Sequence, residues 1–512
     1  MGEAMAVMAA ITDRSAFDAT YETGAPQIIW ERRVADLETP VSAMLKLAAD
    51  EPYSFLLESV EGGAIRGRYS FIGLNPDLIW RCHDDKAEIC RNPVPGAQLS
   101  YETCPEPSLE ALRAILAESE IKMPDGMPPM SAGLVGYMSY DMVRLMERLP
   151  DENPDTLGLP SGLFIRPTVI AVFDTIEESL TVVTPVRPDD EVPAEEAHRA
   201  AESRIESVWQ RLASRDSSGD AQGTTASASV EPVSNMARED FHLMVDRAKE
   251  YIRAGDAFQV VVSQRFALPF DLPPIELYRA LRRLNPSPYL FILNFDEFSV
   301  VGSSPEILVR VRDGVVTIRP IAGTRPRGKT AAEDKDLADE LLNDPKELAE
   351  HLMLLDLGRN DVGRVAEIDS VEVTDQFFIE YYSHVMHIVS NVIGKISADY
   401  DALSAMVAGF PAGTVSGAPK VRAMEIIDEL EPEKRGVYAG CIGYFGADGD
   451  MDTCIALRTA VVKDNTVYVQ AGGGVVADSD PEAEYQESWN KARAIMRAVE
   501  EANRINGGTE TA

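Results

Sequence analysis

Residues 471–491, AGGGVVADSDPEAEYQESWNK, read as the end of a strand, a turn of three glycines and the beginning of a helix. Glycine has no Cβ, so the glycines at 472–474 adopt positive φ freely and let a ligand come close to the backbone. Their adjacent amides are also available to an anion, as in the backbone nests that bind carboxylates. We expect Asp480 to be the N-cap of the helix, with Pro481 at its first position.

The predicted helix carries charged side chains at a regular spacing. Glu484, Glu487 and Lys491 stand at positions i, i+3 and i+7 and therefore share one face. Amide donors, two carboxylates and an ammonium group in one short stretch favour a small dianionic substrate that is held together with a metal ion. A solvent-exposed acidic helix after a flexible turn has the same pattern, so this stretch alone leaves both interpretations open.

The 512-residue chain has the composition of a soluble globular protein, with 45% hydrophobic and 26% charged residues. Its formal charge of −36 excludes nucleic acids and anionic membrane surfaces as partners, because both require a cationic surface. No run reaches the roughly 18 apolar residues of a membrane span. The start, MGEAMAVMAAITDRSAF, lacks the basic region of a signal peptide. The five cysteines, an odd number, predict free thiols in a reducing cytoplasm.

The order of short strands and helices predicts the fold class. Alternating strands such as SFLLESV and LTVVTPV mix with helical segments, which indicates an α+β protein with large, mostly antiparallel sheets. We expect these sheets to form a sandwich-like core with helices packed outside. Residues 214–235 are rich in Ser, Thr, Gly and Ala and are predicted to be a linker. This linker follows a flexible lead-in at residues 1–25 and an N-terminal region at 26–213, and it precedes a C-terminal region at 236–505.

A second helix supplies further candidates for a metal site. It is predicted over residues 343–359, with Asp344 as its cap. Glu350 borders the apolar side of this helix and needs a partner, and together with Glu487 it matches the oxygen ligands that Mg²⁺ accepts. Glu347 stands three residues after Asp344, and a capping box is the simpler explanation for it.

Two histidines lie in the segment YYSHVMHIVSNV, which reads as a strand. His384 and His387 are three residues apart, so their side chains face opposite sides of that strand. The inward one is a candidate acid–base group. A hydrogen-bonded core histidine would have the same spacing.

An ordered set of motifs between residues 301 and 492 carries a family resemblance. The motifs are VGSSPE, RPIAGTRPRG, ELAEHLMLLDLGRNDVGRV, YYSHVMHIVS, FPAGTVSGAPKVRAM, GVYAGCIGYF, DTCIALRTA and AGGGVVADSDPEAEYQESWNKA. In this order they resemble the chorismate-utilising enzymes and, within them, the component I family of the anthranilate synthases. The N-terminal region resembles the same family through LLESV, RGRYSFIG and AGLVGY.

The resemblance implies an activity and a set of site residues in a chorismate-binding catalytic region at 236–505. The family adds ammonia at C2 of chorismate, expels the C4 hydroxyl and eliminates pyruvate, which gives anthranilate in the first committed step of tryptophan biosynthesis. Glu350 and Glu487 would bind Mg²⁺, and whether Glu347 and Glu484 also bind it directly stays open. The substrate-binding residues would be Gly323, Thr324, Tyr438, Arg458, Gly472, Gly473, Gly474 and Lys491.

The implied catalytic residues are Glu306, His387 and Thr324. Glu306 would protonate the leaving C4 hydroxyl, which requires that burial raise its pKa toward neutral pH. His387 would serve the loss of pyruvate. Gln259 stands where water-adding relatives have a lysine base, and ammonia needs no such base.

A neighbouring position separates this resemblance from its nearest alternative. Aminodeoxychorismate synthase has a nucleophilic lysine just before the Gly-Thr pair, and Ala322 stands there in this chain. Ala322 forms no covalent adduct, so it favours anthranilate formation. A catalytically inactive homologue that senses tryptophan is a further alternative, which the intact set of implied site residues opposes.

The resemblance also implies partners and regulation. Nothing in the chain resembles a glutamine amidotransferase, so ammonia would come from solution or from a separate glutaminase subunit, component II, in a heterotetramer. The region at 26–213 would be regulatory and bind tryptophan as a feedback inhibitor. Its contacts would be Ser59 together with Pro288, Tyr289 and Leu290. The family more often has methionine at the position of Leu290, a change between apolar side chains of similar size.

Overall fold

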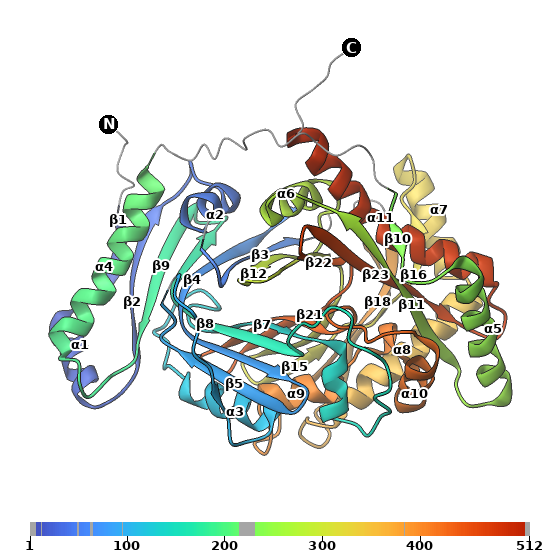
Figure 1. Ribbon diagram of the computed structural model, residues 1–512, viewed down its shortest axis with the longest axis horizontal. Coiled ribbons are helices and arrows are strands. Elements are labelled where there is room, and N and C mark those ends of the chain that lie inside the picture. The colour runs from blue at the N-terminus through green and yellow to red at the C-terminus, as the bar shows by residue number, and fades with distance from the viewer. Residues whose placement is uncertain are drawn as a thin grey trace, which may run out of the picture.

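The computed structural model describes residues 7–11, 13–48, 51–61, 65–94, 96–214, 231–382 and 385–506. Its strands pair antiparallel in one continuous sheet that is folded into two layers (Figure 1). The long strands β4 (Ile65–His83) and β8 (Gly162–Asp174) pair along most of their lengths and run through both layers. The predicted α+β class with mostly antiparallel sheets is therefore confirmed.

The first layer is built on the N-terminal half of β4 and the C-terminal half of β8, and it extends to both sides of this pair. Through β8 it continues into β9 (Ser179–Val186), β2 (Gln27–Val34) and β1 (Val7–Ile11). Through β4 it continues into β3 (Ser54–Glu61), β12 (Tyr289–Asn294), β13 (Ser299–Ser304), β22 (Thr459–Lys463), β23 (Thr466–Val475) and β11 (Gln259–Pro269). The short strands β10 (Val233–Ser234) and β19 (Gly417–Ala418) pair with β11.

The second layer is built on the other halves of β4 and β8. On the β4 side it contains β5 (Lys86–Arg91) and β6 (Glu102–Thr103). On the β8 side it contains β7 (Gly133–Met138), β20 (Cys441–Gly446), β21 (Met451–Ile455), β14 (Ile307–Arg312), β15 (Val315–Ile318), β18 (Val385–Lys395), β16 (Ile321–Pro326) and β17 (Glu372–Tyr381).

Apolar side chains from both layers meet between them. Phe55 of β3 and Phe291 of β12 come from the first layer, and Tyr137 of β7 and Ile442 of β20 come from the second. Each is at most 2% exposed. Buried aromatic rings remove a large apolar area from water, so this cluster holds the layers together and confirms the predicted sandwich.

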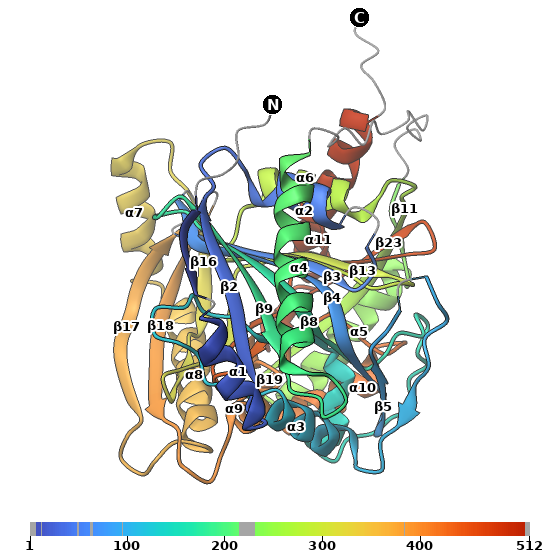
Figure 2. The same cartoon turned by 90° about the vertical axis from the view of Figure 1, so that its left-hand side faces the viewer.

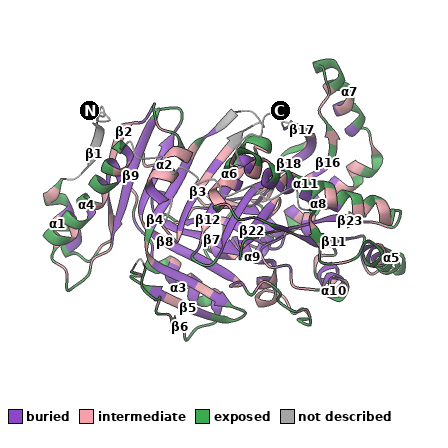
Figure 3. Ribbon diagram, turned by 45° about the horizontal axis from the view of Figure 1, so that its top comes forward, coloured by how far each residue is buried: buried purple, intermediate pink, exposed green. Residues whose placement is uncertain are grey.

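Helices cover the outer faces of both layers, as Figure 3 shows by the purple strands and the green outer sides of the helices. The first layer is covered by α1 (Arg14–Glu22), α2 (Pro40–Ala48), α4 (Ala194–Ala213), α6 (Pro274–Leu284) and α11 (Pro481–Asn506). The second is covered by α3 (Ser108–Glu118), η1 (Tyr140–Leu145), α8 (Pro345–Gly363), α9 (Ala402–Gly409) and η2 (Gly413–Val415). Beside them, α5 (Arg238–Ala254) and α10 (Lys420–Leu430) pack near β11, and α7 (Ala331–Leu341) packs near β18.

The predicted lead-in at residues 1–25 is wrong for the part that the structure describes. Residues 7–11 form β1, and Asp13 caps α1 by accepting a hydrogen bond from the Ser15 amide. Phe17 and Tyr21 of α1 are buried against α4, which lies over β2 and β9 (Figure 2). A helix this short is stable because its apolar face packs on the surface that α4 and the sheet provide.

The predicted linker and the two regions beside it are less separate than the composition suggests. Residues 215–230 lie outside the described residues, and residues 233–234 already pair with β11. Strands from the two predicted regions pair directly, β3 with β12 and β7 with β20. The regions at 26–213 and 236–505 therefore share one sheet and one core.

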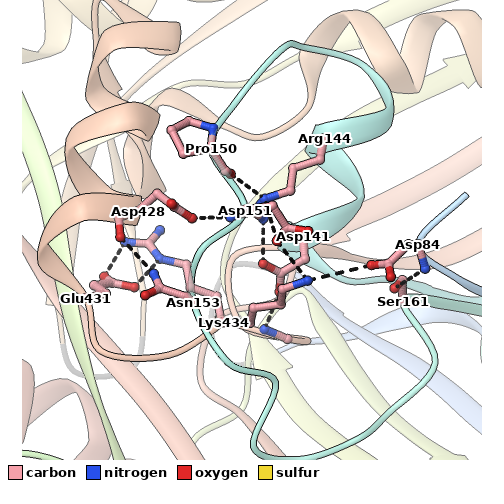
Figure 4. Close-up of polar contacts among 12 residues, drawn as sticks. Asp84, Asp141, Arg144, Pro150, Asp151, Asn153, Ser161, Asp428, Glu431 and Lys434 are labelled. Carbon is pink, nitrogen blue, oxygen red and sulfur yellow. Dashed lines mark hydrogen bonds and ion pairs between the residues drawn. The ribbon is translucent and has the colours of Figure 1, made fainter.

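A polar network also joins the two regions (Figure 4). Arg144 forms an ion pair of 2.8 Å with Asp141 and a second ion pair with Asp428 of α10. Lys434 reaches Asp151 at 2.8 Å. These ion pairs hold the segment around η1 against the C-terminal end of α10.

The most deeply buried ion pair lies directly after α10. Glu431 and Arg435 are 4% and 2% exposed, and the Arg435 Nη2 lies 2.6 Å from Glu431 Oε1. Arg435 also donates to the carbonyls of Val261 on β11 and Val415 of η2, each at 2.7 Å. Glu431 accepts from the Ser263 amide at 2.9 Å. Every partner is satisfied, which is the condition under which buried charges are tolerated.

Two remaining expectations concern membrane-spanning segments and the state of the cysteines. None of the helices among the described residues is both long enough and apolar enough to cross a membrane. All five cysteines are free thiols, as predicted, and Cys441 and Cys454 are buried in the core.

Glu431→Gln is expected to lower the free energy of unfolding by about 3–5 kcal/mol, because it leaves the Arg435 charge buried without its counter-charge. Urea denaturation measures the change. Glu429→Gln, on the exposed side of the same helix, is the matched control and should cost less than about 1 kcal/mol. If both variants lowered the free energy of unfolding by the same small amount, the buried pair would not contribute to stability as proposed.

Candidate active site

The helix α8 presents the first pair of carboxylates. Asp344 is its N-cap and accepts from the Lys346 and Glu347 amides, as predicted. Glu350 follows on the half-buried side, and its Oε1 accepts a hydrogen bond of 3.0 Å from Gln259 Nε2 on β11. Burial raises the pKa of Glu350, and the hydrogen bond from Gln259 opposes this rise.

The second arm of the expected capping box is absent at this helix start, within the described residues. The Glu347 carboxylate accepts from Arg325 Nη1 at 3.2 Å instead of turning back to the Asp344 amide. Glu347 also lies against Gly323, where an added Cβ would be 3.1 Å from Glu347 Oε2. Gly323 has a φ of +67°, so this position favours glycine for its backbone as well.

The glycine stretch is a strand, and the prediction of a positive-φ turn with an amide nest is wrong. Gly472, Gly473 and Gly474 lie in β23 opposite Ser263, Val262 and Val261 of β11, and none of the three has a positive φ. Glycine is needed here because a Cβ would collide with neighbouring side chains. A Cβ on Gly473 would lie 2.6 Å from Glu484 Oε2, and a Cβ on Gly474 would lie 2.3 Å from Gln259 Nε2.

The helix α11 brings the second pair of carboxylates over these glycines. The Asp480 side chain accepts from the Ala483 amide at 2.9 Å, which confirms the predicted cap. Lys491 Nζ lies 2.8 Å from Glu487 Oε1 and donates to the Gly472 carbonyl at 2.9 Å. Glu484 Oε2 is buried and has no hydrogen-bond partner among the described residues.

The charged side chains of α8 and α11 are close enough to influence one another electrostatically. Lys491 of α11 affects the pKa of Glu350 on α8, and Lys346 of α8 affects the pKa of Glu484 on α11. Among the described residues, no three His, Cys, Asp or Glu side chains converge as a ready-made metal cluster. The unpartnered Glu484 oxygen and the space left by Gly473 nevertheless fit a hard cation that takes oxygen ligands.

Glu306 is placed between β13 and β14 and is 7% exposed. Thr414 Oγ1 lies 3.2 Å from Glu306 Oε1, and the Ile321 amide also donates to this carboxyl group. Burial raises the pKa of Glu306 to about 8, against the smaller opposing effects of these hydrogen bonds. The requirement for a raised pKa is therefore met, and the group carries its proton at neutral pH.

His387 is the inward histidine of β18 and is 9% exposed. Its Nδ1 donates to the Gly323 carbonyl at 2.9 Å, with Thr324 Oγ1 3.1 Å from the same nitrogen. This bond leaves Nε2 as the unprotonated nitrogen of the neutral ring. Burial lowers the pKa of His387 to about 4, so the ring is neutral near pH 7. His384 lies outside the described residues.

Arg458 and Tyr438 complete the set. The half-buried Arg458 has a φ of +47°, and its charge lowers the pKa values of both Glu306 and His387. Within the described part of the chain, its guanidinium makes no hydrogen bond or ion pair, and burial lowers its pKa. The Tyr438 hydroxyl accepts a hydrogen bond from the Gly472 amide. An unpaired guanidinium beside an acid and a base is suited to a ligand carboxylate.

A separate cavity of about 660 Å³ lies beside β3, β12, β14, β20 and β21. Ser59, Pro288, Tyr289 and Leu290 all line it, so the structure brings the four expected inhibitor contacts together. Tyr289 donates to Asp452 Oδ1 at 2.8 Å. The lining does not include the carboxylates of α8 and α11, so this is a second site.

Two neighbours of the candidate catalytic groups were not anticipated from the sequence. Thr414 contacts Glu306, and Tyr382 packs on the His387 ring. Both stand inside quoted motifs, FPAGTVSGAPK and YYSHVMHIVS, so the signal was their position in the motif. Thr414 lies in η2 and Tyr382 directly follows β17, so only the tertiary structure brings them to Glu306 and His387.

The chain belongs to the chorismate binding enzyme family, whose model matches residues 75–497. It is 57% identical over 495 residues to anthranilate synthase component 1 of Cereibacter sphaeroides, across 96% of this chain and 98% of that protein. It is 49% identical to anthranilate synthase component 1 of Pseudomonas putida, across 91% of this chain and 94% of that protein.

Solved structures share the fold. The crystal structure of anthranilate synthase component I from Streptococcus pneumoniae superposes with a TM-score of 0.72 at 38% identity, across 84% of this chain and 92% of that one. The menaquinone-specific isochorismate synthase of Escherichia coli superposes with a TM-score of 0.70 at 19% identity, across 95% and 99%, and shares the fold alone.

The carboxyl group of Glu306 is expected to titrate near pH 8. It is protonated below this value and charged above it, so its protonated-carboxyl infrared band should vanish as the pH rises through about 8. Glu306→Gln should remove the band, and Glu500→Gln, at an exposed position of α11, should not. Thr414→Val should move the midpoint upward, because the lost hydrogen bond stabilises the charged form. A band that has vanished by pH 6 would contradict the raised pKa.

Proposed function

We propose that this chain is the chorismate-converting subunit of an anthranilate synthase. Chorismate and ammonia would give anthranilate, pyruvate and water, at the start of tryptophan biosynthesis. The observation that carries the proposal is the pairing of a protonated Glu306 with a neutral His387 beside the unpaired Arg458. The high identity to proteins named anthranilate synthase component 1 supports the same activity.

The two titratable groups suit the two chemical steps. In the first step ammonia forms a bond at C2 while the bond from C4 to its hydroxyl breaks, and Glu306 donates the proton with which this hydroxyl leaves as water. In the second step the C2 proton is removed and the C3–O bond breaks, which makes the ring aromatic and releases the enolate of pyruvate, and this enolate takes up a proton to become pyruvate. His387, with Nε2 unprotonated, is the group that accepts this proton.

The carboxylates of α8 and α11 are proposed to hold Mg²⁺. Glu350 and Glu487 would bind it, and whether Glu347 and Glu484 add further oxygens directly stays open. The bound ion would neutralise the ring carboxylate of chorismate and draw charge from the transition state. The unpartnered oxygen of Glu484 and the glycine-lined space support this assignment.

The remaining side chains are proposed to orient the substrate. Arg458 and Tyr438 would bind the enolpyruvyl carboxylate, for which the free guanidinium offers a bidentate contact. Lys491, which donates to the Gly472 carbonyl at 2.9 Å, and the backbone of Gly472, Gly473 and Gly474 would hold a carboxylate of the substrate. Gly323 and Thr324 would line the pocket and fix the His387 ring through Nδ1.

Two residues support ammonia as the nucleophile. The Gln259 amide touches Glu350 and cannot remove a proton from water, whereas ammonia is a nucleophile without such help. Ala322 is buried at the position that would carry a nucleophilic lysine in aminodeoxychorismate synthase. These positions favour anthranilate over isochorismate or the para-amino product.

The source of ammonia and the assembly are also proposals. The name component 1 of the relatives implies a second component. We infer a separate glutaminase subunit in a cytoplasmic heterotetramer. Tryptophan is proposed to bind in the 660 Å³ cavity as a feedback inhibitor, because aromatic and charged side chains line it together with Ser59, Pro288, Tyr289 and Leu290.

The pure chain should convert chorismate to fluorescent anthranilate and pyruvate when Mg²⁺ and ammonium are supplied at mildly alkaline pH. Glu350→Gln and Glu487→Gln should each abolish turnover and the Mg²⁺-dependent rise in melting temperature, since each removes a charged oxygen ligand.

Glu500→Gln is the matched control, because it makes the same change on an exposed part of α11. Isochorismate, salicylate or para-aminobenzoate as the product would contradict the reaction. Retained activity and Mg²⁺ binding in both carboxylate variants would remove them from the metal site.

Tryptophan should inhibit the ammonia-dependent reaction, and Ser59→Ala should raise the inhibitor concentration for half inhibition about tenfold, the equivalent of one hydrogen bond. The kcat should stay unchanged, because the cavity is separate from the carboxylates of α8 and α11. A titration of the initial rate with tryptophan measures both values. Unaltered inhibition in this variant would exclude Ser59 as a contact.

A further inference from the structure

One wall of the 660 Å³ cavity is also the support of the catalytic acid. Ile321 lines the cavity, and its amide donates to the Glu306 carboxyl group. Two residues later on β16, the Gly323 carbonyl accepts the hydrogen bond from His387 Nδ1 at 2.9 Å. Pro305, which precedes Glu306, lines the same cavity. The cavity and the reacting groups are therefore two sides of one thin layer of protein.

Tyr382 occupies the other part of this wall. It follows β17, is 7% exposed and lines the cavity. Its ring packs edge-to-face on the His387 ring, with centroids 5.3 Å apart and planes at 69°. This contact links a cavity wall directly to the candidate base.

The backbone of Tyr382 is held firmly, which makes its ring the movable part. Its amide donates to the Val385 carbonyl at 2.8 Å, and its carbonyl accepts from Arg327 Nη1 at 2.6 Å. The imidazole of His387 turns about its Cβ–Cγ bond, and the hydrogen bond from Nδ1 to the Gly323 carbonyl already restrains this rotation. The edge of the Tyr382 ring limits this rotation and thereby the direction of Nε2.

We propose that Tyr382 is a positioning residue that aims His387 and transmits occupancy of the cavity to it. An aromatic amino acid in the cavity would press on this wall, and because protein interiors are close-packed, the ring would move with it. The His387 ring would then turn away from its productive direction. The inference rests on the proposed function, since it needs both the reaction and an inhibitor in the cavity.

The decisive variant is Tyr382→Leu, which keeps an apolar side chain but removes the ring edge. We expect kcat to fall about tenfold or more while the KM for chorismate stays within about threefold, because orientation is lost and binding is kept. The Kd for tryptophan, measured by calorimetry, should stay within about threefold, while the fraction of activity that saturating tryptophan inhibits should fall sharply.

Two variants control this experiment. Tyr382→Phe keeps the ring and should restore both kcat and full inhibition. Tyr381→Leu makes the same change at the adjacent residue, which is 39% exposed, and should leave both unchanged. Melting curves test whether each variant folds, and Tyr382→Met takes the place of Tyr382→Leu if the latter does not fold.

The outcomes separate this inference from the proposed function. A folded Tyr382→Leu with unchanged kcat and full inhibition overturns the inference, and so does loss of tryptophan binding in that variant, because Tyr382 is then only a cavity wall. Failure of the unaltered chain to bind tryptophan or to make anthranilate refutes the proposed function itself. Tryptophan binding without inhibition in Tyr382→Leu, together with full inhibition in Tyr382→Phe, is the result that supports the inference.

Discussion

The buried ion pair between Glu431 and Arg435 is the interaction on which the arrangement of the site depends. Arg435 binds carbonyls of β11 and η2 and stacks near the Tyr438 ring, with 5.5 Å to the ring centroid. β11 is the ladder partner of the glycine strand, and η2 carries the contact to Glu306. A buried charge pair is stable only when all its partners keep their places, so it fixes these elements relative to one another.

Burial shifts the pKa values of Glu306 and His387 in opposite directions. It disfavours charge, so the pKa of Glu306 rises and the pKa of His387 falls. Near neutral pH the acid therefore carries a proton and the base has room for one. A pair of groups whose pKa values are pushed apart by their surroundings is the arrangement that acid–base chemistry at neutral pH requires. The strongly acidic surface of the chain has little part in this, because the effect arises inside.

Local patterns in the sequence predicted local structure well. The caps of α8 by Asp344 and of α11 by Asp480 follow from short-range rules. The glycine stretch and the lead-in were wrong for one reason. Glycines at 472–474 make room for Glu484 and Gln259, and α1 forms against α4, so in both cases distant residues decide the local conformation.

The sequence by itself determined the fold class, the family resemblance and the residues that reach the site, because these depend on periodicity and on motifs. Only the tertiary structure decided that the two predicted regions share one sheet, and that Ile321 and Tyr382 stand between the cavity and the candidate catalytic groups. Antiparallel pairing brings residues together that are hundreds of positions apart in the chain. Burial, which shifts the pKa of Glu306 and His387, exists only after that pairing has closed the core.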